Sequence, residues 1–446
     1  GEFSMSISPV PGTSLADSKK LIDEAIKVFE LRGVTDEDIE KFRGGFESQY
    51  INRLQSVSGK VSQLAAYQTY TGNPNMIGQE LARYTSVKKE DVLRVYDQYL
   101  KGKPAVVLSI VTKEQPENIA GAENYKINSA NYKAPDYGYK GLNYNKASDP
   151  FDRNQMPVSG VNPVVKVPEF WKKNLDNGIK AIGTRTTELP IVTLTLTIPG
   201  GHLLQAKDTS KIGLAKMFAA MMNEDTQNYS AEQMQAELQK LGSSMSVYSG
   251  FDGITLRLQS LTRNLDKSLK LFEEQLLRPK FTEEAFSRIQ KQSVEGFKQR
   301  KSQPASIADD VFPLINYGTT IFGSSQNGTE YTVKNLSLKN VEDYYNNYMT
   351  SRNAKLVVVG DVTENDILGK LGFLNKLPDK EVKLPATPAF PKADKTKVYV
   401  IDIPKAAQTE FRVGAIKDLK YDATGEYYRA TLANYPLGGN FNSRIN

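Results

Sequence analysis

The side chains that most often carry out nucleophilic or metal chemistry are scarce in this chain. It contains no cysteine and one histidine, His202, so it has no thiolate site and no recognisable nucleophile–histidine–acid triad. We expect His202, in the turn after a predicted strand, to be a surface residue or a hydrogen-bonded structural one. No glycine-rich phosphate loop followed by a lysine is present, and the carboxylates show no metal-ligand spacing.

Residues 213–226 form a more specific pattern. They read G-L-A-K-M-F-A-A-M-M-N-E-D-T, within a stretch that we predict to be helical over 209–223. The segment resembles the zinc-binding segment of the insulinase/pitrilysin family of zinc metallopeptidases (the inverzincins), which reads roughly G-L-A-H-F-L-E-H-M-x-F-K-G-T. The flanks of the motif match at Gly213, Ala215, Met221 and Thr226.

The resemblance implies that the positions that carry the chemistry hold Lys216, Ala219 and Ala220 here. In active relatives, H-x-x-E-H supplies two zinc ligands on one helix face and a general base that activates the zinc-bound water. An ammonium has no lone pair for a cation, Ala219 replaces the base and Ala220 replaces the second ligand. Glu295 falls about where the third ligand would lie, although it is also readable as a solvated helix-face charge. We expect no metal site in this chain.

A second segment resembles the same family. Residues 436–444 read P-L-G-G-N-F-N-S-R, similar to the L-G-G-x-x-S-R-L segment of even-numbered family domains. The resemblance implies that Arg444 helps to bind the substrate backbone and the oxyanion at a zinc site in another domain, a role that suits a fixed-charge, multi-donor group. The family tyrosine that accompanies it would lie past Asn446. The alternative is a surface arginine.

The elements that must position these residues recur along the chain. An internal repeat with an offset of about 250 residues places 31–37 over 278–284. Each copy reads as three helices followed by a strand. The other matched positions are Arg53 with Arg300, 70–72 with 316–318, Val92, Tyr96 and Tyr99 with Val341, Tyr345 and Tyr348, and 105–112 with 355–363.

Periodicity predicts the individual elements. Apolar residues recur at helical spacing from Leu21 to Phe29, and Thr35 and Thr282 have the pattern of helix N-caps. Alternating or β-branched runs predict strands. The expected strands are 106–111, 180–184, 191–198, 243–249, 253–260, 356–359, 397–402 and 409–416, and further helices are expected at 209–223, 230–242 and 424–435.

The resemblance implies an α+β fold of tandem metallopeptidase-family domains, similar to the mitochondrial processing peptidase, each with a mostly antiparallel sheet packed with helices. The chain then reads as a fragment of a longer protein, interrupted within a domain at both ends. The expected segments are a cloning remnant at 1–5, the C-terminal half of a family domain at 6–112, a linker at 113–165, a complete domain with the degenerate zinc motif at 166–385, and the N-terminal part of a further domain at 386–446.

Composition excludes some functions. The 57 basic and 51 acidic residues give a net charge of +6, which is small and scattered, so we expect no nucleic-acid partner. No apolar run approaches the ~18 residues of a membrane span. The linker is rich in tyrosine, including Tyr125, Tyr132, Tyr137, Tyr139 and Tyr144, so we expect it to pack across a surface; the alternative is a loosely ordered loop.

Two hypotheses about function follow from the resemblance. In the first, the chain is a non-catalytic portion of a zinc metallopeptidase that forms part of the peptide chamber, with zinc in the parent's N-terminal half. In the second, it is an inactive binding or assembly subunit with the peptidase fold. The expected partners are a peptide or unfolded polypeptide, the missing N-terminal half or a catalytic subunit, and a second copy in a swapped homodimer. A bacterial periplasm or cell envelope is the expected location.

Overall fold

The chain divides into two compact units in its computed structural model. One comprises Gly1–Glu40 with Ala82–Pro168, and the other Lys41–Leu81 with Glu169–Asn446. Each unit is described by itself. The structure describes residues 2–9, 12–113, 115, 118–126, 133–145, 152, 154–155, 158, 160–161, 164, 166–392, 394–417, 419–422 and 424–445.

The first unit is built from helices. It contains α1 (Leu15–Arg32), α5 (Lys89–Tyr99) and parts of α2 (Asp36–Arg53) and α4 (Ile77–Thr85). The ring of Phe29 on α1 packs edge-on against that of Tyr96 on α5, with 4.8 Å between centroids. The Tyr96 hydroxyl donates to Glu30 at 2.8 Å. The aromatic pair and this hydrogen bond hold α1 and α5 together.

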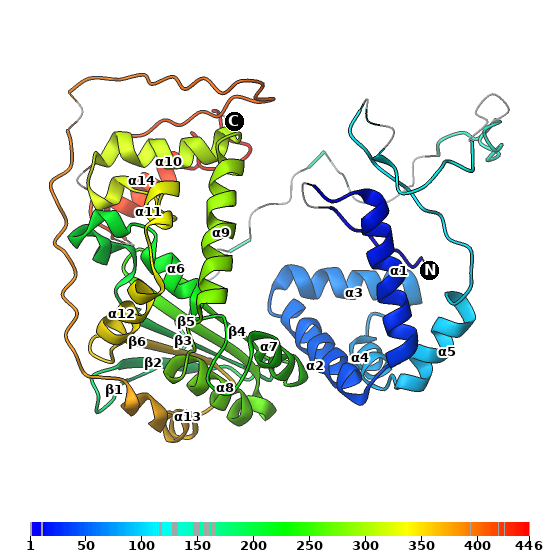
Figure 1. Ribbon diagram of the computed structural model, residues 1–446, viewed down its shortest axis with the longest axis horizontal. Coiled ribbons are helices and arrows are strands. Elements are labelled where there is room, and N and C mark those ends of the chain that lie inside the picture. The colour runs from blue at the N-terminus through cyan, green and yellow to red at the C-terminus, as the bar shows by residue number, and fades with distance from the viewer. Residues whose placement is uncertain are drawn as a thin grey trace. The chain divides into compact units, whose positions relative to one another are not determined.

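The second unit is organised around a six-stranded sheet with the order β1-β2-β6-β3-β5-β4 (Figure 1). Only β2 and β6 run parallel, and the other neighbours are antiparallel. The predicted α+β fold, with a mostly antiparallel sheet packed with helices, is confirmed. The strands are β1 (Trp171–Asn174), β2 (Lys180–Arg185), β3 (Ile191–Pro199), β4 (Ser244–Ser249), β5 (Gly253–Leu261) and β6 (Lys355–Gly360).

Alternation along the strands gives the sheet one buried and one more open face. On β3, Leu194, Leu196 and Ile198 are fully buried, whereas Thr195 and Thr197 between them are only partly buried. The buried side chains join the main hydrophobic core with residues of the covering helices. The predicted hairpin of β4 and β5 is present.

Helices and short 3-10 turns cover the buried face. Among the described residues, no helix is long and apolar enough to span a membrane. The helical elements after β3 are η3 (Gly201–Lys207), η4 (Thr209–Lys211), α6 (Leu214–Met221), α7 (Ala231–Lys240), η5 (Thr262–Asn264), α8 (Leu265–Leu277), α9 (Glu283–Arg300), α10 (Pro304–Tyr317), η6 (Ile321–Gly323), α11 (Glu330–Lys334), α12 (Leu338–Tyr348), α13 (Glu364–Lys370), η7 (Gly372–Lys376) and α14 (Glu426–Asn434), of which α14 has no buried residue.

Two predicted helices have different lengths from those expected. The predicted helix 209–223 is split into η4 and α6, because Gly213 has φ +100° and ends the first turn. The predicted helix 230–242 forms α7, which begins at a capping box of Ser230 and Gln233. Gly242 follows α7 with a positive φ, as a residue that ends a helix often has.

The internal repeat is confirmed in the helices. α2 and α9 both have 18 residues, and the hydroxyls of Thr35 and Thr282 accept from backbone N–H groups in their first turns. α3 (Val57–Thr71) and α10 are both followed by a glycine with positive φ, Gly72 and Gly318. α5 and α12 both have 11 residues and end in tyrosine.

The helices of residues 41–81 pack within the sheet-containing unit. Arg263 of η5 donates to both carboxylate oxygens of Glu47 on α2, at 2.5 and 2.6 Å, and Gln259 of β5 donates to the Asn52 side chain. Gly44 lies so close to the carbonyl of Gln239 on α7 that a Cβ atom would be 2.3 Å from it. Any larger residue at 44 would therefore displace α2 from α7.

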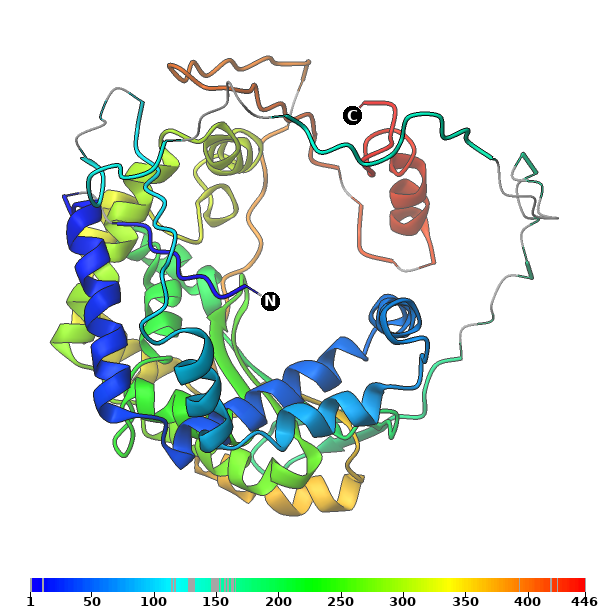
Figure 2. The same cartoon turned by 90° about the vertical axis from the view of Figure 1, so that its right-hand side faces the viewer.

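Three expected strands are absent. Residues 106–111, 397–402 and 409–416 have no regular structure where they are described, and Val106 and Val400 are 98% and 89% exposed. The orange segment after residue 386 is drawn as chain without strand arrows (Figure 2). The strand predictions there are wrong because β-propensity alone does not make a strand: backbone groups need an adjacent strand to pair with.

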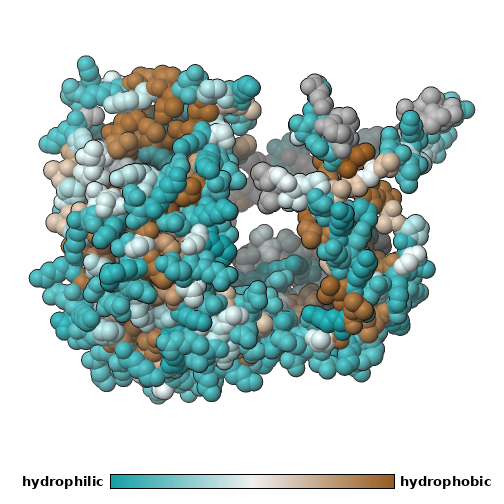
Figure 3. Space-filling view, in the orientation of Figure 1, coloured by the Kyte–Doolittle hydropathy of each residue, from teal (hydrophilic) through white to brown (hydrophobic). Residues whose placement is uncertain are grey.

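The linker tyrosines that are described do not pack as expected. Tyr125, Tyr137, Tyr139 and Tyr144 are all exposed. The rings of Tyr137 and Tyr139 stack on each other, with 5.6 Å between centroids. Tyr132 lies outside the described residues. A hydrophobic area is instead visible over α10 (Figure 3), where Leu314 is 47% exposed.

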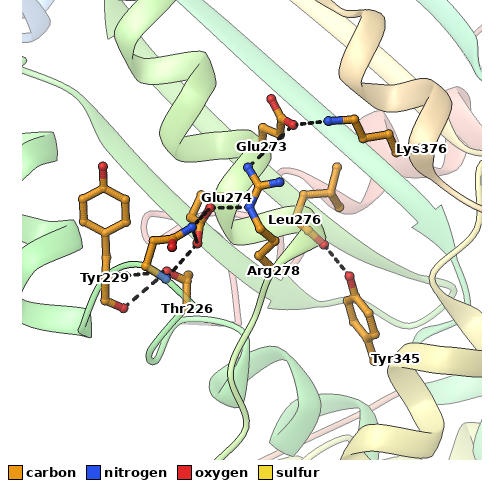
Figure 4. A network of polar contacts seen from close by, with 9 residues as sticks. Thr226, Tyr229, Glu273, Glu274, Leu276, Arg278, Tyr345 and Lys376 are labelled. Atoms are coloured by element: carbon orange, nitrogen blue, oxygen red, sulfur yellow. Dashed lines mark hydrogen bonds and ion pairs between the residues drawn. The ribbon is translucent and has the colours of Figure 1, made fainter.

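A chain of polar contacts fixes the loop that follows α6 (Figure 4). The Glu274 side chain is only 4% exposed and accepts from Arg278 at 2.5 Å, and from the backbone and side chain of Asn228 at 3.1 Å. Burial alone would raise the pKa of the Glu274 carboxyl, but the hydrogen bonds from Arg278 and Asn228 hold it below its usual value. Glu273 accepts from Lys376 at 2.7 Å and extends the network.

Glu274→Gln is therefore expected to destabilise the sheet-containing unit by about 1.5–3 kcal/mol near neutral pH, because the charge-assisted bonds are lost. The pKa of the Glu274 carboxyl is lowered from 4.5 in the folded state. The stability that the ionised carboxylate contributes is therefore fully present above pH 4.5, and it is lost as the pH falls through the lower pKa of the folded state. The difference between wild type and variant should shrink as the pH falls below about 4.5. Urea unfolding, followed by the fluorescence of Trp171 on β1, measures it.

Glu295→Gln is the matched control, because the Glu295–Lys298 ion pair is exposed on both sides and such pairs contribute little. A Glu274→Gln variant as stable as this control at neutral pH would contradict the role given to the network.

Candidate functional site

The degenerate motif lies on α6, which is anchored on its apolar side. The ring of Phe218 stacks on that of Tyr344 with 4.5 Å between centroids, and Met221 and Met222 are fully buried. The Tyr344 hydroxyl accepts from the backbone N–H of Gly201 at 3.0 Å, and burial raises its pKa. The packing of α6 therefore does not depend on any ligand.

The three motif positions offer no metal ligand. Lys216 is exposed, and its ammonium donates to the side-chain oxygen of Asn327. Ala219 is buried, with 3% exposure, and Ala220 is partly buried. A cation at Lys216 and two methyl groups do not fit a zinc ion, which needs N, S or O donors.

Glu295 lies on α9, which packs against α6. Its carboxylate is exposed and accepts from Lys298 at 2.7 Å on its own helix. Within the part of the chain that the structure describes, no hydrogen bond or ion pair joins Glu295 to Lys216. The structure thus brings the two helices together but gives Glu295 a surface partner.

His202 is a structural residue, as expected. It is 1% exposed, its Nε2 lies 3.1 Å from both the Ile321 carbonyl and the Ser324 hydroxyl, and its ring packs 5.4 Å from that of Phe251. Burial lowers the pKa of the imidazole. Among the described residues, no group of three or more His, Cys, Asp or Glu side chains could hold a metal ion.

Arg444 lies in the loop after α14. Its backbone N–H donates to the carbonyl of Pro436 at 3.1 Å, and that of Ile445 donates to Leu437 at 3.1 Å, so the loop folds back on the end of the helix. The Arg444 side chain is exposed. The backbone is thus held at a turn from which the guanidinium can reach a group outside this loop.

Asn223, two residues after the end of α6, is a site residue that the sequence alone did not predict. Its side-chain N–H₂ donates to the carbonyls of Ala219 at 2.7 Å and Val247 at 2.8 Å, and its Oδ1 accepts from the Val247 N–H at 2.9 Å. The one sequence signal for Asn223 is its place within the 213–226 motif, because an asparagine after a helix is by itself an ordinary turn residue.

Comparison with known families matches two parts of the chain. Residues 182–344 match the insulinase model (peptidase family M16), and residues 335–446 match the model of the M16 peptidase inactive domain. The first range includes α6 and α9, and the second includes β6, α14 and Arg444. Neither match includes residues 1–181.

Individual relatives are distant. The "Non-peptidase homolog YmxG" of Helicobacter pylori is 26% identical over 58% of this chain and 58% of its own length. Subunit beta of the mouse mitochondrial-processing peptidase is 19% identical over 53% of this chain and 48% of its own length. A peptidase M16 inactive domain from Pseudomonas fluorescens has a TM-score of 0.47 and 23% identity, over 50% of this chain and 55% of that one.

The chain thus spans less than two thirds of the length of these curated relatives. In sequence, the two family models together cover everything from β3 to the end of the chain, including β4, β5, β6 and α14. Within residues 182–446 the chain is thus similar to the insulinase (M16) family of peptidases and to its inactive domain.

Proposed function

We propose that this chain is a non-catalytic portion of an M16 zinc peptidase, and that it forms part of the chamber that binds the peptide. The observation that carries the proposal is the composition of α6, where Lys216, Ala219 and Ala220 occupy the motif without a ligand atom or a base. Zinc and the general base would then belong to a domain outside this chain, in the parent's N-terminal half or in a partner subunit.

The open face of the sheet supports a role in lining a chamber. Thr193, Thr195 and Thr197 of β3 are partly exposed on it, and Val357 and Val359 of β6 are each 40% exposed. Hydroxyl and short apolar side chains on a rigid sheet offer both hydrogen bonds and contact area to an extended polypeptide. The occupant we propose is a peptide or an unfolded polypeptide.

Arg444 is the residue that we propose to act in the reaction. An exposed guanidinium presents several donors with a permanent charge, which suits a peptide carbonyl and the oxyanion that forms from it. The segment boundaries expected from the sequence, 6–112, 113–165, 166–385 and 386–446, form part of the same proposal.

A second candidate is an inactive binding or assembly subunit. The similarity to the Helicobacter pylori protein named as a non-peptidase homolog favours it, as does the match of residues 335–446 to the inactive-domain model. The two candidates differ in the parent: an H-x-x-E-H motif in its N-terminal half supports the first, and its absence supports the second.

A third proposal concerns a second copy of the chain. The exposed runs 106–111 and 397–402 are rich in β-branched residues. By the internal repeat, 106–111 takes the place of β6, which has a strand on each side in the observed sheet. Two copies could exchange these runs and form a swapped homodimer.

The purified protein should contain no stoichiometric zinc and should cleave no peptide. Elemental analysis after dialysis measures the metal, and a fluorogenic peptide library measures cleavage. The double variant K216H/A220H provides a positive control, because histidines four residues apart on a helix face are expected to bind zinc measurably. One tightly bound zinc per wild-type chain would overturn the proposal.

Arg444→Ala should lower kcat about 10²-fold or more when this chain is assembled with the zinc-bearing domain, since the loss of an oxyanion donor has such effects. Arg429→Ala on α14 is the matched control, because Arg429 is exposed and pairs with Glu426. Equal activity of the two variants would remove Arg444 from the reaction.

A swapped homodimer predicts a particle of twice the chain's mass in light scattering, and Val400→Pro should return it to a monomer because proline removes a backbone donor from the 397–402 run. Val164→Pro, in the linker, should leave the dimer intact. A wild-type protein that is monomeric over a wide concentration range would exclude the swap.

A further inference from the structure

The outer edge of the sheet on the β4 side has a well-defined set of outward backbone groups. β4 is the last strand in the order, so no strand among the described residues pairs with its other edge. The N–H of Gly250 donates to the carbonyl of Gly253 at 2.8 Å, which makes those residues a hydrogen-bonded pair of the hairpin. Antiparallel pairs alternate, so the backbone groups of Ser249, Val247 and Met245 point away from β5.

Asn223 occupies the central one of these three positions. Its amide accepts from the Val247 N–H at 2.9 Å and donates to the Val247 carbonyl at 2.8 Å, which are the two bonds that a paired strand would make there. The second N–H of the amide donates to the Ala219 carbonyl at 2.7 Å. Both donors are therefore used, and the amide is held in one orientation by α6.

Exposed side chains lie along β4 and at Asn223. Ser246 and Tyr248 on β4 are exposed, and Asn223 itself is exposed, whereas the Val247 side chain is buried beneath the strand. Charged residues and prolines usually protect an edge strand from pairing, and β4 carries neither. An uncharged, accessible edge is a template for adding a further strand.

We propose that Asn223 is an internal substitute for a neighbouring strand and that it closes the β4 edge to extended polypeptides. A peptide that pairs along β4 needs the outward groups of Met245, Val247 and Ser249 in succession, and Asn223 takes the middle pair. In this chain an extended peptide is therefore excluded from β4 as long as the Asn223 amide is in place. The inference does not depend on zinc or on cleavage.

Hydrogen exchange in the wild-type protein tests the closed edge directly. The Val247 amide should exchange at least tenfold more slowly than the outward amides of Met245 and Ser249, after correction for intrinsic rates, because it alone of the three is bonded to Asn223. Residue-resolved exchange by NMR or by electron-transfer fragmentation measures this. A Val247 amide that exchanges as fast as the other two would overturn the proposal.

Substitution of Asn223 tests the exclusion. The probe is a fluorescein-labelled peptide with the sequence of β5, Gly253–Leu261, which already pairs with β4 in antiparallel register within the fold. Asn223→Ala should bind it at least tenfold more tightly than wild type in fluorescence anisotropy, or should self-associate through the opened edge in light scattering. Asn347→Ala, an exposed asparagine on α12, should behave as wild type.

A folded Asn223→Ala variant, with the wild-type circular dichroism spectrum, that neither binds the peptide nor self-associates would overturn the exclusion. If the variant does not fold, Asn223→Asp takes its place, because a carboxylate can accept from the Val247 N–H but cannot donate to its carbonyl. A smaller gain in binding than that expected of Asn223→Ala should then appear, because only the bond to the Val247 carbonyl is lost, and no gain in a folded Asn223→Asp variant would contradict the proposal.

Discussion

The insertion of β6 between β2 and β3 is the constraint on which the sheet depends. β6 pairs in parallel with β2 and antiparallel with β3, although most of the unit's helices lie between it and both partners in the sequence. A parallel neighbour requires such a crossover. The helices of the second repeat copy carry the chain back to this place, and the apolar side chains of β6 complete the core that α6 packs against.

The same constraint explains why similar sequences have different structures in the two repeat copies. Residues 105–112 match β6 in β-branched content and follow helices of matching length, yet they form no strand, because no strands flank them in the structure. Residues 397–402 and 409–416 likewise form no strand, and no strand among the described residues pairs with them. Hydrophobic periodicity could predict α9, α12 and β3, whose partners lie in the same unit, but it carries no information on whether a partner strand is present.

The candidate site was predictable in part. The motif positions Lys216, Ala219 and Ala220 could be found from a linear pattern, and the absence of ligand atoms in them is a property of residue types alone. The Glu295–Lys298 pair follows from their spacing on one helix. The burial of His202 and the bonds of Asn223 could not be predicted, because both depend on segments distant in sequence: η6 supplies the partners of His202, and β4 those of Asn223.

The bonds of Asn223 also help to explain how residues 213–226 form a well-packed helix and turn. α6 contributes to the fold through the Phe218 ring, the methionines and the small Ala219 side chain of its buried face, and through the backbone carbonyl of Ala219, which receives one N–H of the Asn223 amide. None of these contacts needs a metal ligand at position 216, 219 or 220. The helix therefore holds the turn after it against β4 through protein contacts alone, and these contacts form the link between α6 and the sheet edge.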